Sequence, residues 1–161
     1  MKTIIYNEGQ LIKERLAKIS DYIYNNPELG NKEYKAVEAL TTFLKEHNFQ
    51  VECPIADMDT AFKATFDSGK PGMTIGYLCE YDALPKIGHG CGHNMIGAIS
   101  SGAAVALSKV LDEIGGKIIV YGTPAEETNG GKVILAEAGV FDELDAAMIV
   151  HPDGETRASG S

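Results

Sequence analysis

The sequence predicts an α/β fold, in which a largely parallel β-sheet is flanked by helices. Short apolar segments with strand character alternate with helical segments through the second half of the chain, and this order favours right-handed crossovers between parallel strands. The length of 161 residues and the hydrophobic fraction of 44% suit one globular domain. Ligands of such sheets bind at the carboxyl ends of the strands, so functional residues are expected there.

Two helices are expected before the first strand. Within Glu8–Tyr24, apolar residues recur at intervals of three, four and seven residues, which is typical of an amphipathic helix. A second helix is predicted over Lys32–Glu46, with Val37, Leu40 and Leu44 on one face. The apolar stripe of the first helix consists of Leu11, Ile12, Leu16, Ile19 and Ile23.

Strands and two further helices follow. Strands are expected where short apolar or alternating runs lie between turn signals such as Asp67–Gly72. A helix is predicted over Met95–Leu111, with Asn94 as its N-cap and Gly115–Gly116 at its end, and a short helix over Gly131–Ala138. The predicted strands cover Phe49–Pro54, Thr60–Phe66, Met73–Leu78, Lys117–Tyr121 and Ala146–Val150.

The composition disfavours several classes of partner. The formal net charge is −9, which argues against nucleic acid and anionic membranes, because both require a basic surface. The amino-terminal residues carry too short an apolar run for a signal peptide or a membrane span, so a cytoplasmic protein is expected. Cys53, Cys79 and Cys91 form an odd set without CxxC spacing, so we expect reduced thiols.

The segment Gly88–Asn94, GHGCGHN, holds half of the histidines of the chain and one of its three cysteines. Cys91 and His93 lie two residues apart, so in an extended loop their side chains point to the same side, and the glycines allow a tight turn around a small ligand. A thiolate with an imidazole favours zinc over magnesium or calcium. The positive end of the following helix should lower the pKa of the thiol and keep His93 neutral. Alternatively, Cys91 is a small buried residue and His93 a loop histidine.

The segment Thr123–Gly131, TPAEETNGG, places two adjacent glutamates after a predicted strand. Neighbouring carboxylates repel each other unless a cation lies nearby. One of Glu126 and Glu127 would then bind a metal ion, and the other would be the general base that takes a proton from water and passes it to the leaving amine. Alternatively, both are exposed residues at a helix start, where Thr128–Asn129 supplies an N-cap.

Two further candidates follow predicted strands. His151 comes after an apolar strand and would lie at the same edge of the sheet as the other candidates, although a lone histidine is usually structural. Asp82, in the segment EYDALP, would hydrogen-bond a ligand histidine and fix its orientation. Alternatively, Asp82 is an ordinary turn residue before Pro85.

Three segments of the chain carry the candidate residues: EYDALPKIGHGCGHN, GTPAEETNGGK and DAAMIVHP, in this order. They resemble the successive metal-site motifs of the two-metal amidohydrolases and carboxypeptidases that include aminoacylases, hippurate hydrolases and indole-acetyl-amino-acid hydrolases. The resemblance extends over most of the chain and is close to the branch of the aminobenzoyl-glutamate hydrolases. It implies a zinc-peptidase-like catalytic domain that hydrolyses the amide bond of N-acyl amino acids or small peptide-like conjugates.

The resemblance also implies roles for individual residues. Cys91 would bridge two divalent metal ions, with His93 and His151 on one ion and Glu127 on the other. Zinc is the expected metal, with manganese, cobalt and nickel as alternatives. The implied catalytic residues are Glu126, as the base, and Asp82, as the carboxylate that orients the ligands.

Members of this family are longer than this chain. They contain a second, smaller domain that serves as lid and dimerisation surface, and then a returning segment with one more histidine ligand. We therefore expect residues 1–161 to form the amino-terminal part of a catalytic domain that lacks the lid domain, is inactive alone and self-associates through exposed surface. Two alternatives stay open: a non-catalytic metal-binding or interaction module, and a hydrolase in which Cys91 is the nucleophile and a histidine its base.

Overall fold

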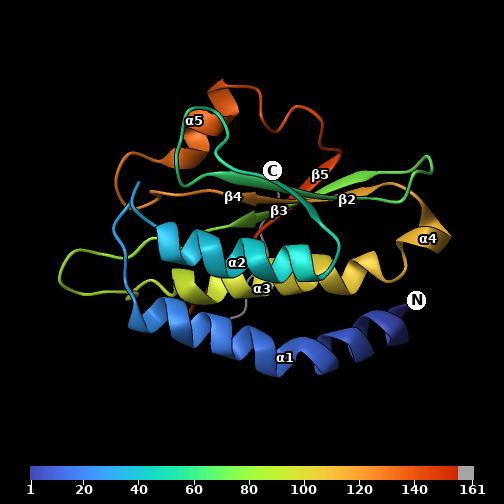
Figure 1. The fold of residues 1–161 in the computed structure, drawn as a ribbon, viewed down its shortest axis with the longest axis horizontal. Coiled ribbons are helices and arrows are strands. Elements are labelled where there is room, and N and C mark those ends of the chain that lie inside the picture. Colours follow the sequence, from blue (N-terminus) through green and yellow to red (C-terminus); the bar gives the residue numbers. More distant parts are fainter. Residues whose placement is uncertain (156–161) are drawn as a thin grey trace.

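A single β-sheet of five strands organises residues 1–155, the part of the chain that the computed structural model describes (Figure 1). The strands are ordered β1-β2-β4-β3-β5 across the sheet. The last strand ends at Met148 instead of the predicted Val150. The strands are β1 (Gln50–Glu52), β2 (Phe62–Asp67), β3 (Thr74–Cys79), β4 (Lys117–Gly122) and β5 (Ala146–Met148).

The α/β class and the helices around one sheet are confirmed, but the sheet is less parallel than expected. β3 pairs in parallel with both β4 and β5, whereas β1 pairs with β2, and β2 with β4, in antiparallel orientation. A parallel pair requires a crossover of about a dozen residues or more, usually through a helix. The link between β1 and β2 is too short for one, while helices follow β3 and β4. The parallel half of the sheet is the half that carries the site.

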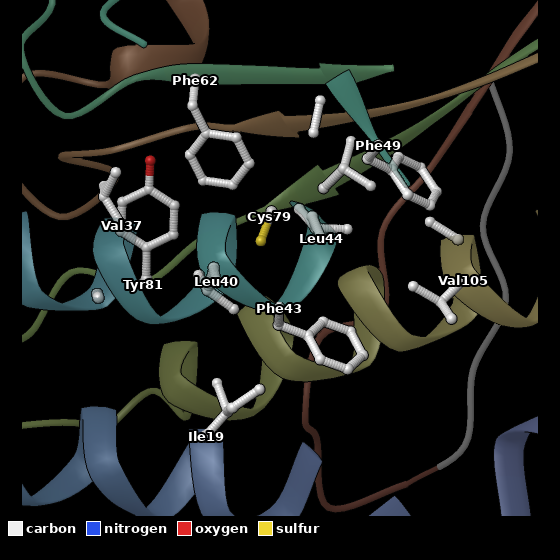
Figure 2. Close-up of a cluster of buried hydrophobic side chains, with 14 of the residues drawn as sticks. Ile19, Val37, Leu40, Phe43, Leu44, Phe49, Phe62, Cys79, Tyr81 and Val105 are labelled. Carbon is white, nitrogen blue, oxygen red and sulfur yellow. The ribbon is translucent and has the colours of Figure 1, made fainter. Parts of the chain in front are cut away.

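Three long helices cover one face of the sheet (Figure 1). They are α1 (Lys2–Asn25), α2 (Tyr34–Glu46) and α3 (His93–Ser108). α2 and α3 contact the strands, and α1 packs against these two helices as an outer layer. The core between the layers includes Leu40, Phe43 and Tyr81, which are fully buried (Figure 2). Val37, Leu40 and Leu44 all face this core, as their spacing predicts.

The buried face of α1 differs from the prediction at one residue. Ile12, Ile19 and Ile23 belong to the core, and Leu16 packs partly buried against it. The expectation for Leu11 is wrong, because its side chain is 77% exposed. Successive residues of a helix are rotated by about 100°, so Leu11 lies well away from a stripe centred on Ile12 and Ile19.

The start of α3 also differs from the prediction. The helix begins at His93, and Gly92 precedes it as N-cap in the left-handed conformation, with φ of 78°. Asn94 is therefore not the cap but lies inside the first turn. Its side-chain amide donates a hydrogen bond to Oγ of Ser20 over 2.9 Å, which ties the start of α3 to α1.

The helix predicted to reach Leu111 is interrupted after Ser108. A separate short helix, α4 (Leu111–Ile114), follows and ends at Gly115, which has φ of 74°. A Cβ atom on Gly115 would lie 2.2 Å from the carbonyl oxygen of Pro71. The glycine thus allows the chain to turn tightly against the loop between β2 and β3 before it enters β4.

A smaller helix covers the opposite face of the sheet (Figure 1). This helix, α5 (Gly131–Glu137), agrees with the predicted range. Its Leu135 packs in a second apolar cluster with Met58 and Ala61. Within residues 1–155, the helices are all too short or too polar to cross a membrane.

Candidate metal centre

The carboxyl ends of the three parallel strands carry acidic and histidine side chains, as the fold class predicts. Asp82 follows β3, Glu126 and Glu127 follow β4, and His151 follows β5. The glycine-rich loop leads from β3 into α3 and adds Cys91 to the same edge. Residues that are far apart in the sequence therefore meet at one place.

Asp82 connects two of the candidate ligands. Its Oδ1 lies 2.8 Å from Nδ1 of His93, and its Oδ2 accepts a hydrogen bond from the backbone N–H of Glu127 over 3.0 Å. Both Asp82 and His93 are buried. The contact at Nδ1 leaves Nε2 of His93 to face the other donors, and Oε1 of Glu127 lies 3.8 Å from it. This is the geometry of a carboxylate that fixes the orientation of a ligand histidine.

Two groups of three potential metal ligands share His93. Cys91, His93 and Glu127 form one group, and Glu80, His93 and His151 form the other. In each group the donor atoms all lie within 4.8 Å of one another. The rings of His93 and His151 meet edge to face, with centroids 5.9 Å apart. The structure thus brings together the four predicted ligands and adds Glu80.

The donor set fits a borderline divalent ion such as zinc, which binds sulfur, nitrogen and oxygen together. Cys91 supplies sulfur, His93 and His151 supply nitrogen, and Glu127 supplies oxygen. One carboxylate oxygen of Glu80 is buried and has no hydrogen-bond partner among the described residues. Buried polar atoms are normally satisfied, so this oxygen indicates a position suited to a cation.

The protonation states expected for the loop are wrong for the protein without an ion. A hydrogen bond with Glu127, then burial and the charges of Glu127, Glu126 and Asp82, raise the pKa of Cys91 to about 11. Burial alone would lower the pKa of His93, but the hydrogen bond and charge of Asp82, together with nearby glutamates, outweigh it and raise that pKa. The surrounding carboxylates therefore dominate over the helix N-terminus. A divalent cation would replace these protons.

The two adjacent glutamates occupy different environments. Glu127 is half-buried and contributes to the Cys91 group, while Glu126 is exposed and belongs to neither group. Both lie in a turn before α5, whose N-cap is Gly130 with φ of 64° and not Thr128–Asn129. The charge of Glu126 still acts on Cys91, so Glu126 lies beside the cluster.

Glu33 supports this turn and was not predicted from the sequence. Its buried carboxylate accepts hydrogen bonds from the backbone N–H of Ala125 over 2.8 Å and from Oγ1 of Thr60 over 2.7 Å. Ala125 directly precedes the glutamate pair and has φ of 59°, in the left-handed region. No local sequence signal marks this contact, because the partners lie far apart in the chain.

Glu80 was also missed. Its side chain is 4% exposed, its Oε1 pairs with Nζ of Lys132 on α5, and its Oε2 lies 3.3 Å from Nε2 of His93. A signal was present in the sequence: Glu80 and Asp82 lie two residues apart after a strand, so an extended chain points both to the same side.

An α/β sheet with thiol, imidazole and carboxylate groups at the ends of its parallel strands is typical of metal-dependent hydrolase domains. Residues 56–160 match the family model described as Peptidase family M20/M25/M40. The chain belongs to this family, as the resemblance of its three motifs implies.

Relatives with similar sequences include peptidases and amidohydrolases. The chain is 40% identical over 162 residues to the Xaa-Arg dipeptidase of Mus musculus, a match that covers 90% of this chain and 36% of the relative. It is 36% identical over 160 residues to a p-aminobenzoyl-glutamate hydrolase of Escherichia coli, a match that covers 88% of this chain and 33% of the relative. The chain therefore spans about a third of the length of these proteins.

Solved structures share the fold. An aminohydrolase from methicillin-resistant Staphylococcus aureus matches with a TM-score of 0.81 and 29% identity, over 91% of this chain and 41% of the other. A Bacillus subtilis protein, described as a dinuclear metal-binding peptidase of the M20 family, matches with a TM-score of 0.76 and 24% identity, over 86% of this chain and 42% of the other.

Proposed function

We propose that this chain carries the metal-binding part of an amidohydrolase that cleaves the amide bond of an N-acyl amino acid or a small peptide-like conjugate. The observation that carries the proposal is the convergence of Cys91, His93 and Glu127 within 4.8 Å, at the strand ends of an M20 family sheet. The names of the relatives, a dipeptidase and an aminobenzoyl-glutamate hydrolase, support the substrate class. Because the chain spans about a third of these relatives, we place residues 1–161 in the amino-terminal part of the catalytic domain.

Two divalent ions are proposed for the site. Cys91 would bridge them, His93 and His151 would bind one ion, and Glu127 would bind the other. Zinc is favoured over manganese, cobalt or nickel, because the set combines a thiol with two imidazoles. When bound, the ions would supply Lewis acidity at the amide carbonyl.

The remaining chemistry belongs to side chains of this protein. Asp82 holds the ring of His93 and the backbone of Glu127 in place. Glu126 is exposed beside the cluster, so its carboxylate is placed to take a proton from the attacking water and to return it to the leaving amine.

The structure disfavours the alternative in which Cys91 is a nucleophile. A catalytic cysteine requires a lowered pKa, which a neighbouring cation or helix terminus provides. Here Glu127 and other carboxylates raise the pKa of Cys91 to about 11.

A reducing compartment, such as the cytoplasm, is proposed because all three cysteines are free.

The proposal is tested with the 161-residue chain and with a protein in which it is joined to the remaining segments of its relatives. Hydrolysis of N-acetyl amino acids, p-aminobenzoyl-glutamate and dipeptides that end in arginine is measured with and without a chelator. Because the 161-residue chain is expected to be inactive alone, turnover is expected from the joined protein. There we expect the chelator to abolish turnover, and Glu126→Gln to lower kcat by about 100- to 10,000-fold with the metal content unchanged. Glu137→Gln, on the exposed side of α5, is the matched control.

Retained turnover in Glu126→Gln would contradict the role of this residue as base. Turnover that resists the chelator, in a protein free of metal, would contradict the metal-dependent mechanism. Full metal occupancy of the joined protein with no hydrolysis of any of these substrates would favour the non-catalytic metal-binding module.

A further inference from the structure

Glu80 is a buried carboxylate at the metal centre to which the function above assigns no role. It directly follows Cys79, the last residue of β3, and its side chain is 4% exposed. Its Oε1 pairs with Nζ of Lys132 on α5. Oε1 therefore has an ion-pair partner from the helix on the opposite face of the sheet, whereas Oε2 does not contact this lysine.

The second oxygen of Glu80 points into the cluster. Oε2 lies 3.3 Å from Nε2 of His93, and within residues 1–155 nothing donates a hydrogen bond to it. A buried carboxylate oxygen without a donor costs free energy, unless a cation lies beside it. Donor atoms of Glu80, His93 and His151 all lie within 4.8 Å of one another, which is close enough for one ion.

The ring of His93 decides how the ligands divide between two ions. Its Nδ1 is occupied by Asp82, so Nε2 offers the one free lone pair and binds a single ion. Oε2 of Glu80 lies 3.3 Å from Nε2 and shares a ligand group with His151. Oε1 of Glu127 lies farther from Nε2, at 3.8 Å, and belongs to the Cys91 group.

We propose that Glu80 binds the same divalent ion as His93 and His151, through Oε2, while Lys132 holds Oε1. The proposal deepens the function proposed above and rests on its metal centre. With the bridging sulfur of Cys91, that ion has four protein ligands, the number that zinc takes in proteins. The added oxygen also makes the site more favourable for manganese than a set of nitrogen and sulfur alone.

The competing explanation is a structural ion pair. In that case Glu80 and Lys132 would stabilise the fold by linking β3 to α5, and the affinity for metal would not depend on either residue. The two explanations differ in a quantity that is measured without catalysis, namely the dissociation constant of each ion.

The test uses Glu80→Gln in the 161-residue chain, because glutamine preserves the shape of the side chain and its contact with Lys132. Zn²⁺ and Mn²⁺ are titrated against a chromophoric chelator, and the thermal midpoint of the metal-free protein is recorded in parallel. Removing a group that only orients a ligand lowers metal affinity by about 10- to 100-fold. The loss of a ligand should cost more, so we expect the affinity for one of the two ions to fall by about 100-fold or more. Glu137→Gln is the control and should bind both ions as the parent does.

Lys132→Met keeps the proposal falsifiable if Glu80→Gln folds poorly. Lys132 orients the Glu80 carboxylate by holding Oε1, so we expect Lys132→Met to lower the affinity for one of the two ions by about 10- to 100-fold. Parent-like affinity for both ions in folded Lys132→Met, or in folded Glu80→Gln, would overturn the proposal.

His93→Ala separates this inference from the function on which it rests. If His93→Ala loses metal while Glu80→Gln keeps both ions, the role of Glu80 is refuted and the metal centre stands. If His93→Ala also binds both ions as the parent does, the metal centre itself is refuted.

Discussion

Asp82 holds His93 and Glu127 with its two carboxylate oxygens, at 2.8 Å from Nδ1 of the histidine and 3.0 Å from the backbone nitrogen of the glutamate. One side chain at the end of β3 therefore positions both His93, on α3, and the turn that follows β4. Burial raises the pKa of Asp82, but the contacts with His93 and Glu127 outweigh it and lower that pKa. The carboxylate thus stays ionised, and its charge is available to the imidazole.

Asp82→Asn should weaken metal binding without removing a ligand. The amide keeps the size of the side chain but loses the charge and one of the two acceptors, so His93 and Glu127 are no longer both held. We expect an affinity about 10- to 100-fold lower, measured by competition with a chromophoric chelator. Asp112→Asn, at an exposed position of α4, should bind metal as the parent does. Equal affinity in Asp82→Asn and Asp112→Asn would contradict this positioning role.

Gly92→Ala should destabilise the protein, whereas Gly9→Ala should stabilise it. Gly92 has φ of 78°, and an added Cβ would lie 2.9 Å from side-chain atoms of Met95 and Pro152. The left-handed conformation alone costs a non-glycine residue about 1–2 kcal/mol. Gly9 lies within α1 with nothing within 4 Å of its Cβ position, and alanine gains about 0.5–1 kcal/mol inside a helix. Urea denaturation measures both changes, and a shift of equal sign in the two variants would contradict the account.

Glu33→Gln should change the pH dependence of stability. Burial raises the pKa of Glu33 above 4.5, despite hydrogen bonds with Thr60 and Ala125 that lower it. The folded state therefore binds a proton more tightly than the unfolded state, and the contribution of Glu33 to stability falls as pH rises from about 4.5 through the folded pKa. The glutamine side chain of the variant does not titrate, so the free energy of unfolding of the parent should fall relative to that of the variant between pH 4.5 and neutral pH.

The measurement for Glu33 is a series of urea denaturations across this pH range. Glu113→Gln, at an exposed position of α4, is the control and should follow the parent profile. Parallel profiles for Glu33→Gln and the parent would show that the carboxyl has the same pKa in both states.

Ile19→Ala and Leu11→Ala test the orientation of α1. Ile19 is 4% exposed in the core and Leu11 is 77% exposed. Truncation of a buried isoleucine costs about 2–5 kcal/mol, whereas a surface substitution changes stability by about 0.5 kcal/mol or less. The free energy of unfolding should therefore separate two residues of equal size. A large loss in Leu11→Ala would place the opposite face of the helix against the core.

Local patterns in the sequence determined the order of the elements and the family. Val37, Leu40 and Leu44 follow the 3.6-residue period of α2, and turn residues separate the strands. Both patterns extend over short stretches of chain, so they can be recognised from the sequence alone. The same holds for Cys91 and His93, whose spacing and glycine neighbours lie in one loop. The rule that strand ends gather ligands then predicted that they meet Glu127 and His151.

The tertiary structure alone decided which distant groups touch and how charged they are. Glu33 reaches Ala125, and Glu80 lies between Lys132 and His93, through contacts that no local pattern encodes. The pKa of Cys91 rises because several carboxylates surround the loop, although its place before a helix predicted the opposite. Electrostatic energies depend on distance and burial in three dimensions. The pKa of a side chain is therefore determined in part by residues that are remote from it in the sequence.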